Sequence, residues 1–139
     1  MYVDSSYGGG SSDGSVTKPY VALTTAFSAK IVEGSTVAYC FKLAPGEYTG
    51  KLNYNMTNPT QSFKIEGSGP DCTFVQSGTS FSAAPNDNVM FFRDFKRIEV
   101  SDLCIRFGAY GFYPRSCESA TLRNVRFVNC GSVGTVNRH

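Results

Sequence analysis

The chain has 139 residues, which suits a single domain, and its 14 glycines and 14% aromatic residues favour a turn-rich β protein. The net charge of +2 comes from 13 basic and 11 acidic residues scattered along the sequence, so no basic run is available to follow nucleic acid or to coat an anionic membrane. No apolar stretch approaches the roughly 18 residues that span a bilayer, and neither nucleic acid nor a membrane is expected as a partner.

The first 31 residues divide into a polar loop and an amphipathic segment. Residues 1–18 are rich in Gly and Ser, so we expect a loop there after a very short strand. In KPYVALTTAFSAKIV the apolar residues recur at intervals of three and four, Pro19 suits a helix start, and Gly34 suits a stop. This pattern predicts one helix over residues 19–31.

Beyond the helix, Gly, Pro, Asn, Asp or Ser interrupts every apolar run, which predicts short strands and turns. An antiparallel sandwich is one way to arrange such strands. However, IEVSDLCIRFG (98–108) aligns with ATLRNVRFVNC (120–130) at an offset of 22 residues, so that Val100 matches Leu122. Short repeats of this kind favour a β-solenoid, in which each coil buries its inward face by stacking on the next.

The solitary helix has a role in such a solenoid. The first coil would otherwise expose apolar core and unpaired strand edges, and an amphipathic helix laid across it covers both. We therefore expect Phe27, which lies on the apolar stripe with Leu23 and Ile31, to pack on the first coil.

Several segments carry a family resemblance. They are YVDSSYGGGSSDGSVTKPYVALTTAFSA, FKLAPGEYTG, FKIEGSGPDCTFV, VSDLCIRFGAYG and LRNVRFVNCG. Over residues 2–134 these segments resemble the N-terminal part of right-handed parallel β-helix proteins of the pectin-lyase-like superfamily, which includes pectate lyases, pectin methylesterases, chondroitinase-B-like lyases and phage tailspikes. The resemblance implies an all-β fold, a right-handed single-stranded parallel β-helix with one N-terminal capping α-helix.

The expected organisation is one β-helix domain over residues 1–139. It comprises the polar loop 1–18, the capping helix 19–31, about four coils in 36–134, and the tail 135–139. Superfamily members with lyase or esterase activity generally continue for several more coils and carry their catalytic residues in central coils. The chain is therefore expected to be an N-terminal segment, a naturally short protein, or a subunit whose open end stacks on another chain. The chain alone is not expected to be a complete enzyme. If it is one, a polysaccharide lyase or a related carbohydrate-active enzyme is expected, with an active site formed across an oligomer interface as the third alternative.

Neither the cysteines nor the histidine predicts a catalytic or zinc site. The five cysteines are widely spaced without a C-x-x-C motif, so we expect small buried hydrophobic residues, with one or two disulfides or a reactive thiol as the alternatives. His139 is the only histidine, which disfavours Ser/His or Cys/His catalysis. Asn55-Met56-Thr57 is a glycosylation sequon that matters if a eukaryote secretes the chain.

Two carboxylates are candidate metal ligands, because a calcium-dependent lyase needs clustered carboxylates. Asp94 and Asp102 are expected at corners on either side of one strand, where binding of turn amides is the simpler interpretation. Calcium is thus a possible cofactor, and no other cofactor is expected.

Basic and aromatic residues offer a candidate carbohydrate site. Arg106 and Arg126 are expected to point outward on one face in consecutive coils, with Arg123 one corner away, and guanidinium groups pair well with carboxylate or sulfate. Tyr110 and Tyr113 lie in the Gly-punctuated segment FGAYGFYPR, where sugar rings could stack on them. A solvated charged face and rings that cover the core are the alternative interpretations.

These patterns favour a module that binds or helps to process acidic polysaccharide, located outside the cell or on the surface of a virion or cell. The alternative is a non-catalytic structural, viral-fibre or adhesive β-helix that self-assembles. Because no second amphipathic helix follows ATLRNVRFVNC, we also expect association through the C-terminal coil, with another copy or with further coils.

Overall fold

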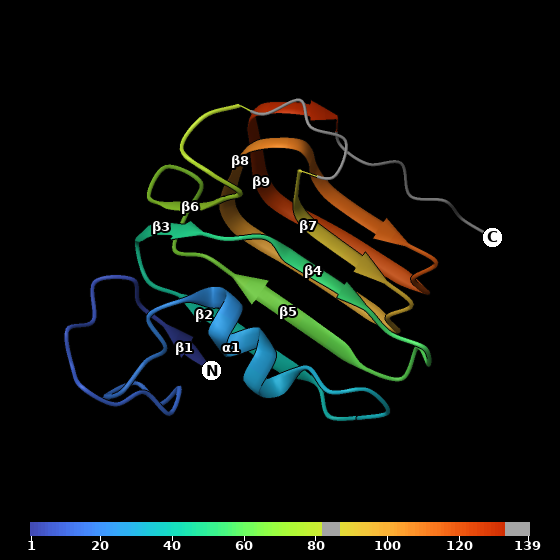
Figure 1. Ribbon diagram of the computed structural model, residues 1–139, viewed down its shortest axis with the longest axis horizontal. Helices are drawn as coiled ribbons and strands as arrows, with labels where there is room; N and C mark the ends of the chain where they lie inside the picture. The colour runs from blue at the N-terminus through green and yellow to red at the C-terminus, as the bar shows by residue number, and fades with distance from the viewer. Residues whose placement is uncertain (82–86, 133–139) are drawn as a thin grey trace.

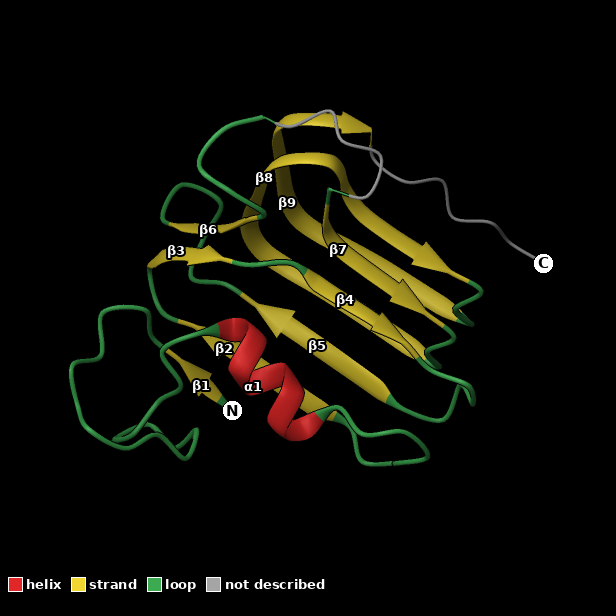
Figure 2. Cartoon of the chain, in the orientation of Figure 1, coloured by secondary structure: helices red, strands yellow, loops and turns green. Residues whose placement is uncertain are grey.

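The computed structural model describes residues 1–81 and 87–132 and shows an all-β protein with one short helix (Figure 2). Its elements in chain order are β1 (Tyr2–Val3), α1 (Leu23–Lys30), β2 (Tyr39–Leu43), β3 (Gly46–Thr49), β4 (Leu52–Asn55), β5 (Ser62–Glu66), β6 (Thr73–Gln76), β7 (Asn88–Arg93), β8 (Arg97–Arg115) and β9 (Ser119–Ser132). The predicted tail 135–139 with His139, and the predicted coil residues 133–134, lie outside the described residues.

The strands stack in parallel into three columns that form one curled sheet (Figure 1). The first column contains β1, β2, β5 and the starts of β8 and β9. The second contains β3, β6 and the middle parts of β8 and β9, and the third contains β4, β7 and the ends of β8 and β9. This solenoid-like, parallel arrangement confirms the predicted all-β class.

The 22-residue offset found in the sequence is the register between β8 and β9. Val100 lies beside Leu122, and Ile105 lies beside Phe127, as the alignment predicted. Val100 and Ile105 are at most 1% exposed, because the coils on both sides cover them. The repeat therefore marks the side chains that fill the interior.

Single residues in the left-handed region turn the chain at the corners between columns. These residues are Asp94, Asp102 and Phe107 and, 22 positions later, Ser116, Asn124 and Asn129, with φ between 51° and 61°. Asp and Asn tolerate this conformation because their short polar side chains form local hydrogen bonds. The corner positions expected for Asp94 and Asp102 are thus confirmed.

Helix α1 lies at the same end of the stack as β1 and β2, and β9 lies at the opposite end (Figure 1). Phe27 of α1 is fully buried, with its ring centroid 4.3 Å from that of Phe41 and 5.1 Å from that of Phe63. The expected packing of Phe27 on the first coil is confirmed. Among the described residues, no helix is long and apolar enough to cross a membrane.

The helix is shorter than the predicted range 19–31. Tyr20 cannot join it, because the backbone N–H of Tyr20 donates to Tyr2 and its carbonyl accepts from Asp4, which adds Tyr20 to the edge of β1. Ile31 already has an extended conformation, with φ −87° and ψ 108°. Tertiary strand pairing therefore prevails over the helical start signal of Pro19.

The polar loop after β1 is anchored to that strand. The N–H of Tyr2 donates to the carbonyl of Gly14, whose own N–H donates to Lys18. Tyr48, which is 3% exposed, shares its one hydroxyl proton between the carbonyls of Val3 and Ala44, at 3.0 and 2.9 Å. These bonds fix the N-terminal segment against β2 and β3.

Replacing Phe27 tests how α1 is held. Phe27→Ala should lower the free energy of unfolding by about 3 to 5 kcal/mol, because it removes a fully buried ring that touches rings on several strands. Val32→Ala, at a position 55% exposed, is the control and should change it by about 0.5 kcal/mol or less. A loss below about 1 kcal/mol for Phe27→Ala in a denaturant melt would refute the capping role.

Candidate functional site

Arg106 is held on the outer surface of the second column by contacts from neighbouring coils. Its Nε donates to Oε1 of Gln76 at 2.5 Å, and its terminal nitrogen forms an ion pair with Glu47. The guanidinium also lies over the ring of Phe74, 4.2 Å from the centroid. The side chain of Arg106 thus ties β8 to β6 and β3.

Arg126 and Arg123 also have carboxylate partners. Arg126 lies in register with Cys104 on the second column, and its guanidinium contacts Asp71 at 2.7 Å and donates to the carbonyl of Pro70. Arg123 belongs to the first column and pairs with Asp102 at 3.0 Å. The structure therefore brings Arg106 and Arg126 to one outer surface, where each faces a carboxylate of the protein.

Asp94 and Asp102 lie at different corners and bind side chains there. Asp102 accepts hydrogen bonds from Nδ2 of Asn124 at 2.9 Å and from Arg123. The bond from Asn124 is the main reason that the pKa of Asp102 lies below its usual value. Asp94 forms an ion pair with Arg93 at 3.1 Å. Within residues 1–81 and 87–132, no three His, Cys, Asp or Glu side chains gather as a metal-ligand set.

Tyr110 and Tyr113 lie together on the outer surface of the third column. Their ring centroids are 5.5 Å apart with an angle of 26° between the planes, so the rings are stacked. Phe91, which is in register with Tyr113 on β7, adds a third ring at 5.4 Å. All three residues are half-buried. They form an aromatic surface across two coils.

Polar side chains continue this aromatic surface. Asn53 lies in register with Phe91, and the next outward row contains Asn55, Arg93 and Arg115, all exposed. We call the complete set the outer strip: Asn53, Asn55, Phe91, Arg93, Tyr110, Tyr113 and Arg115.

Arg93 and Arg115 are neighbours in the outer strip, and like charges directly opposite each other on adjacent strands are destabilising. Arg93 pairs with Asp94, whereas Arg115 takes part in none of the ion pairs of the described residues. The outer strip therefore combines ring faces, amides and a guanidinium that an external anion could reach.

Only Tyr110 and Tyr113 of the outer strip were predicted from the sequence. Extending the 22-residue offset towards the N-terminus aligns Phe91 with Tyr113 and Arg93 with Arg115. That extension would have revealed Phe91, Arg93 and Arg115 as members of the strip. Asn53 could not be found in this way, because the coil that contains β4 has a different spacing from the next.

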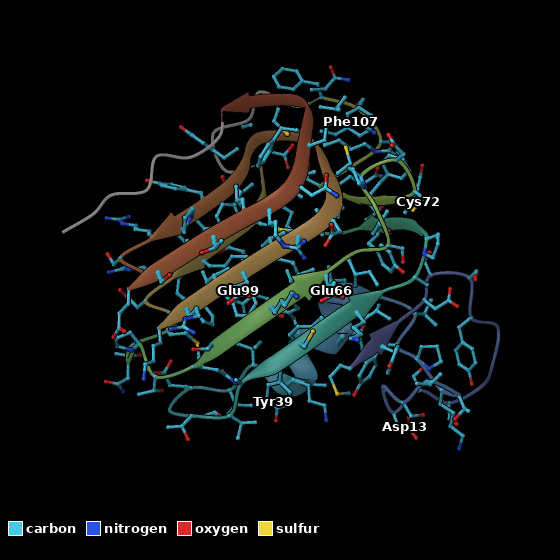
Figure 3. All side chains as sticks on the ribbon, turned by 180° about the vertical axis from the view of Figure 1, so that it is seen from behind. Asp13, Tyr39, Glu66, Cys72, Glu99 and Phe107 are labelled. Atoms are coloured by element: carbon cyan, nitrogen blue, oxygen red, sulfur yellow. The ribbon has the colours of Figure 1, made fainter. Side chains whose placement is uncertain are left out.

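Described residues of the first column, away from the outer strip, line three hollows in the surface. One of about 380 Å³ is lined by Tyr39, Cys40, Lys64, Arg97 and Glu99, among others. Figure 3 shows this side, with Glu66 and Glu99 on neighbouring strands. Lys64 pairs with Glu66 at 2.6 Å. Charges of both signs alternate here, which suits a polyanion less well than the outer strip does.

The expectation that the cysteines are buried holds for Cys104, while the other four are half-buried. All five are free thiols, and Cys104 is 1% exposed. Burial raises the pKa of Cys117 and of Cys130 above the usual value of a thiol. Raised pKa values lower the fraction of thiolate, the nucleophilic form, so these two residues are poor candidates for catalysis.

No family model and no curated protein sequence matches the chain. The solenoid-like stacking is compatible with the superfamily that the sequence motifs resemble, but it is shared by proteins of many activities. Function must therefore be inferred from the side chains themselves.

Substitutions of Asp102 distinguish a structural role at the corner from a role as a metal ligand. Asp102→Asn should cost less than about 1 kcal/mol, because Asn tolerates the left-handed conformation and only an exposed ion pair is lost. Asp102→Ala should cost about 1 to 2 kcal/mol more, since Ala is strained at φ 58°.

Urea melts of both variants, with calcium or with a chelator, provide the measurement. The wild-type midpoint should be the same in both solutions. Equal losses for the two variants would contradict the corner role, and a calcium-dependent rise that both variants abolish would identify a metal ligand instead.

Proposed function

We propose that the chain is a right-handed parallel β-helix of the pectin-lyase-like type whose outer strip binds acidic polysaccharide outside the cell or on the surface of a virion or cell. The observation that carries this proposal is the row formed by Arg93 and Arg115 beside the rings of Phe91 and Tyr113. The parallel coils and the sequence motifs support the architecture.

The outer strip matches the chemistry of an acidic sugar chain. The apolar faces of sugar rings can pack on the exposed parts of Tyr110 and Tyr113, whose stacked rings cover one another in part. The fork of a guanidinium suits a carboxylate or sulfate, to which it can donate two parallel hydrogen bonds. Asn53 can donate to and accept from sugar hydroxyls with its amide.

Because the coils stack, groups of this kind recur in rows that run across the strands, and an extended polymer can follow such a row. Neighbouring parallel strands lie about 4.8 Å apart. Equivalent side chains on β4, β7 and β8 therefore form rows that cross the strands, such as Asn53, Phe91 and Tyr113. An extended polymer along a row would contact several coils at once.

The arginines predicted from the sequence are less suited to this role. Arg106, Arg123 and Arg126 each pair with a carboxylate of the protein, so an incoming anion would have to displace Glu47, Asp102 or Asp71. At Arg115 an incoming anion would displace no carboxylate of the described residues.

Binding to a uronic-acid polymer tests the proposal. Polygalacturonate should bind to the wild-type chain, and neutral dextran should not. Tyr113→Ala and Arg115→Ala should each weaken binding about tenfold, which corresponds to about 1.4 kcal/mol, whereas Arg126→Ala, on the second column, should bind like the wild type. Calorimetry measures the affinity.

Equal weakening by Arg115→Ala and Arg126→Ala would show a general charge effect and contradict the outer strip as the site. The absorbance of unsaturated uronides in the same samples reports lyase activity, and repeating the titrations with calcium reports any metal requirement.

Self-association is a second candidate function, favoured by the exposure of β9. Leu122 is 37% exposed although it occupies an inward position, whereas Val100, its register partner, is 1% exposed. Val125 and Phe127 of the same strand are half-buried. Among the described elements β9 pairs with β8 alone, so its other edge offers free backbone groups to a second copy.

Sedimentation at several concentrations measures this association. We expect concentration-dependent growth in mass that Leu122→Glu reduces, because the substitution places a charge on the proposed contact. Val37→Glu, at an exposed position far from β9 in the stack, should have no effect. A monomer at every concentration, with the amides of residues 120–130 protected from hydrogen exchange, would refute self-association.

A further inference from the structure

The sequon Asn55-Met56-Thr57 begins at Asn55, the last residue of β4, on the outer surface of the third column. Asn55 and Thr57 are exposed, while Met56 between them is 6% exposed and belongs to the core. The acceptor amide and the hydroxyl of the sequon therefore both face solvent, and the side chain between them anchors the segment.

The backbone around the sequon is held by bonds that involve neither of these side chains. The N–H of Met56 donates to the carbonyl of Arg93 at 3.0 Å. The N–H groups of Thr57 and Asn58 donate to the carboxylate of Glu33, each at 2.9 Å. A substituent on Nδ2 of Asn55 would consequently disturb no buried group and none of these bonds.

We propose that Asn55 is the acceptor of an N-linked glycan. Nδ2 of Asn55 would form a bond to C1 of the first sugar of a lipid-linked oligosaccharide, the donor that N-glycosylating transferases use. The bond between C1 and the diphosphate oxygen breaks, and the lipid diphosphate leaves with the bonding electrons. Nδ2 gives up one proton to the solvent.

A second tripeptide nearby resembles the sequon and serves as a comparison. Asn58-Pro59-Thr60 has the same outer residues as a sequon, but Pro at the middle position excludes it from glycosylation. Asn55-Met56-Thr57 is the single sequence of the permitted form in the 139 residues. Modification should therefore be confined to one side chain.

A glycan on Asn55 would affect the outer strip. Asn55 lies in register with Arg93, which lies in register with Arg115, so the first sugars would extend from the row that contains both guanidinium groups. The glycan would then hinder access of an acidic polymer to Arg115. This consequence rests on the proposed function, whereas the acceptor role of Asn55 does not.

The test is to secrete the full chain from a eukaryotic cell behind a cleavable leader, together with a glycoprotein that reports transferase activity. Intact mass is measured before and after treatment with an amidase that releases N-glycans and converts the acceptor Asn to Asp. The wild-type chain should carry one glycan. Asn55→Gln and Thr57→Ala should abolish it, and Thr57→Ser and Asn58→Gln should retain it.

An unmodified wild-type chain beside a modified reporter, or a glycan that persists in Asn55→Gln, would overturn the proposal. Thermal melts of the secreted variants establish that each one is folded, and the substitutions affect exposed side chains. The glycosylated chain should melt like the enzymatically released one, and a large loss on glycosylation would contradict an undisturbed fold.

The effect on the outer strip is measured separately. The glycosylated chain should bind polygalacturonate more weakly than the unglycosylated Thr57→Ala chain, which keeps an unmodified Asn55. The enzymatically released chain is unsuitable here, because release converts Asn55 to Asp and so places a carboxylate beside Arg93. Equal binding by the two chains would refute only the claim that the glycan hinders access to Arg115. If the unglycosylated chain does not bind at all, the proposed polysaccharide function is refuted and the assignment of Asn55 as the acceptor stands.

Discussion

The fold depends on one constraint: each coil can bury its inward apolar side chains only against the coils next to it. Val100 and Ile105 are covered because β5 and β6 lie on one side and β9 on the other. At the first coil no earlier coil exists among the described elements, and the ring of Phe27 fills the interior instead. Parallel stacking, the helix and the exposure of β9 all follow from this requirement.

The sequence predicted those parts of the fold that repeat over a short distance. The offset between residues 98–108 and 120–130 fixed the register of β8 and β9, because inward positions must match from coil to coil. The predicted start of the helix at residue 19 was wrong. Tyr20 pairs with β1, and this pairing joins two segments that the polar loop separates in the sequence. Handedness is a global property that no local pattern of apolar residues expresses.

The candidate site was predicted less completely. Tyr110 and Tyr113 stand out in a Gly-rich segment, and the structure indeed stacks their rings. The arginines have obvious chemistry, but their partners are distant in sequence: Glu47 lies 59 residues before Arg106, and Asp71 lies well before Arg126. Whether a surface charge is already neutralised is decided by such long-range contacts. Local sequence therefore identifies an arginine as a candidate but does not tell whether its guanidinium is free to bind a ligand.

The corner residues have a consequence for how such a chain can change in length. Within a column, one inserted residue would turn every following side chain of that strand from the interior to the surface. At a corner, extra residues leave the registers of both neighbouring columns intact. The corner between the second and third columns gives an example: the chain between β6 and β7 is much longer than the single bend at Phe107 in β8. Variation in length should accordingly collect at the edges of the columns, so that loops beside the outer strip can diversify while the stacked interior keeps its period.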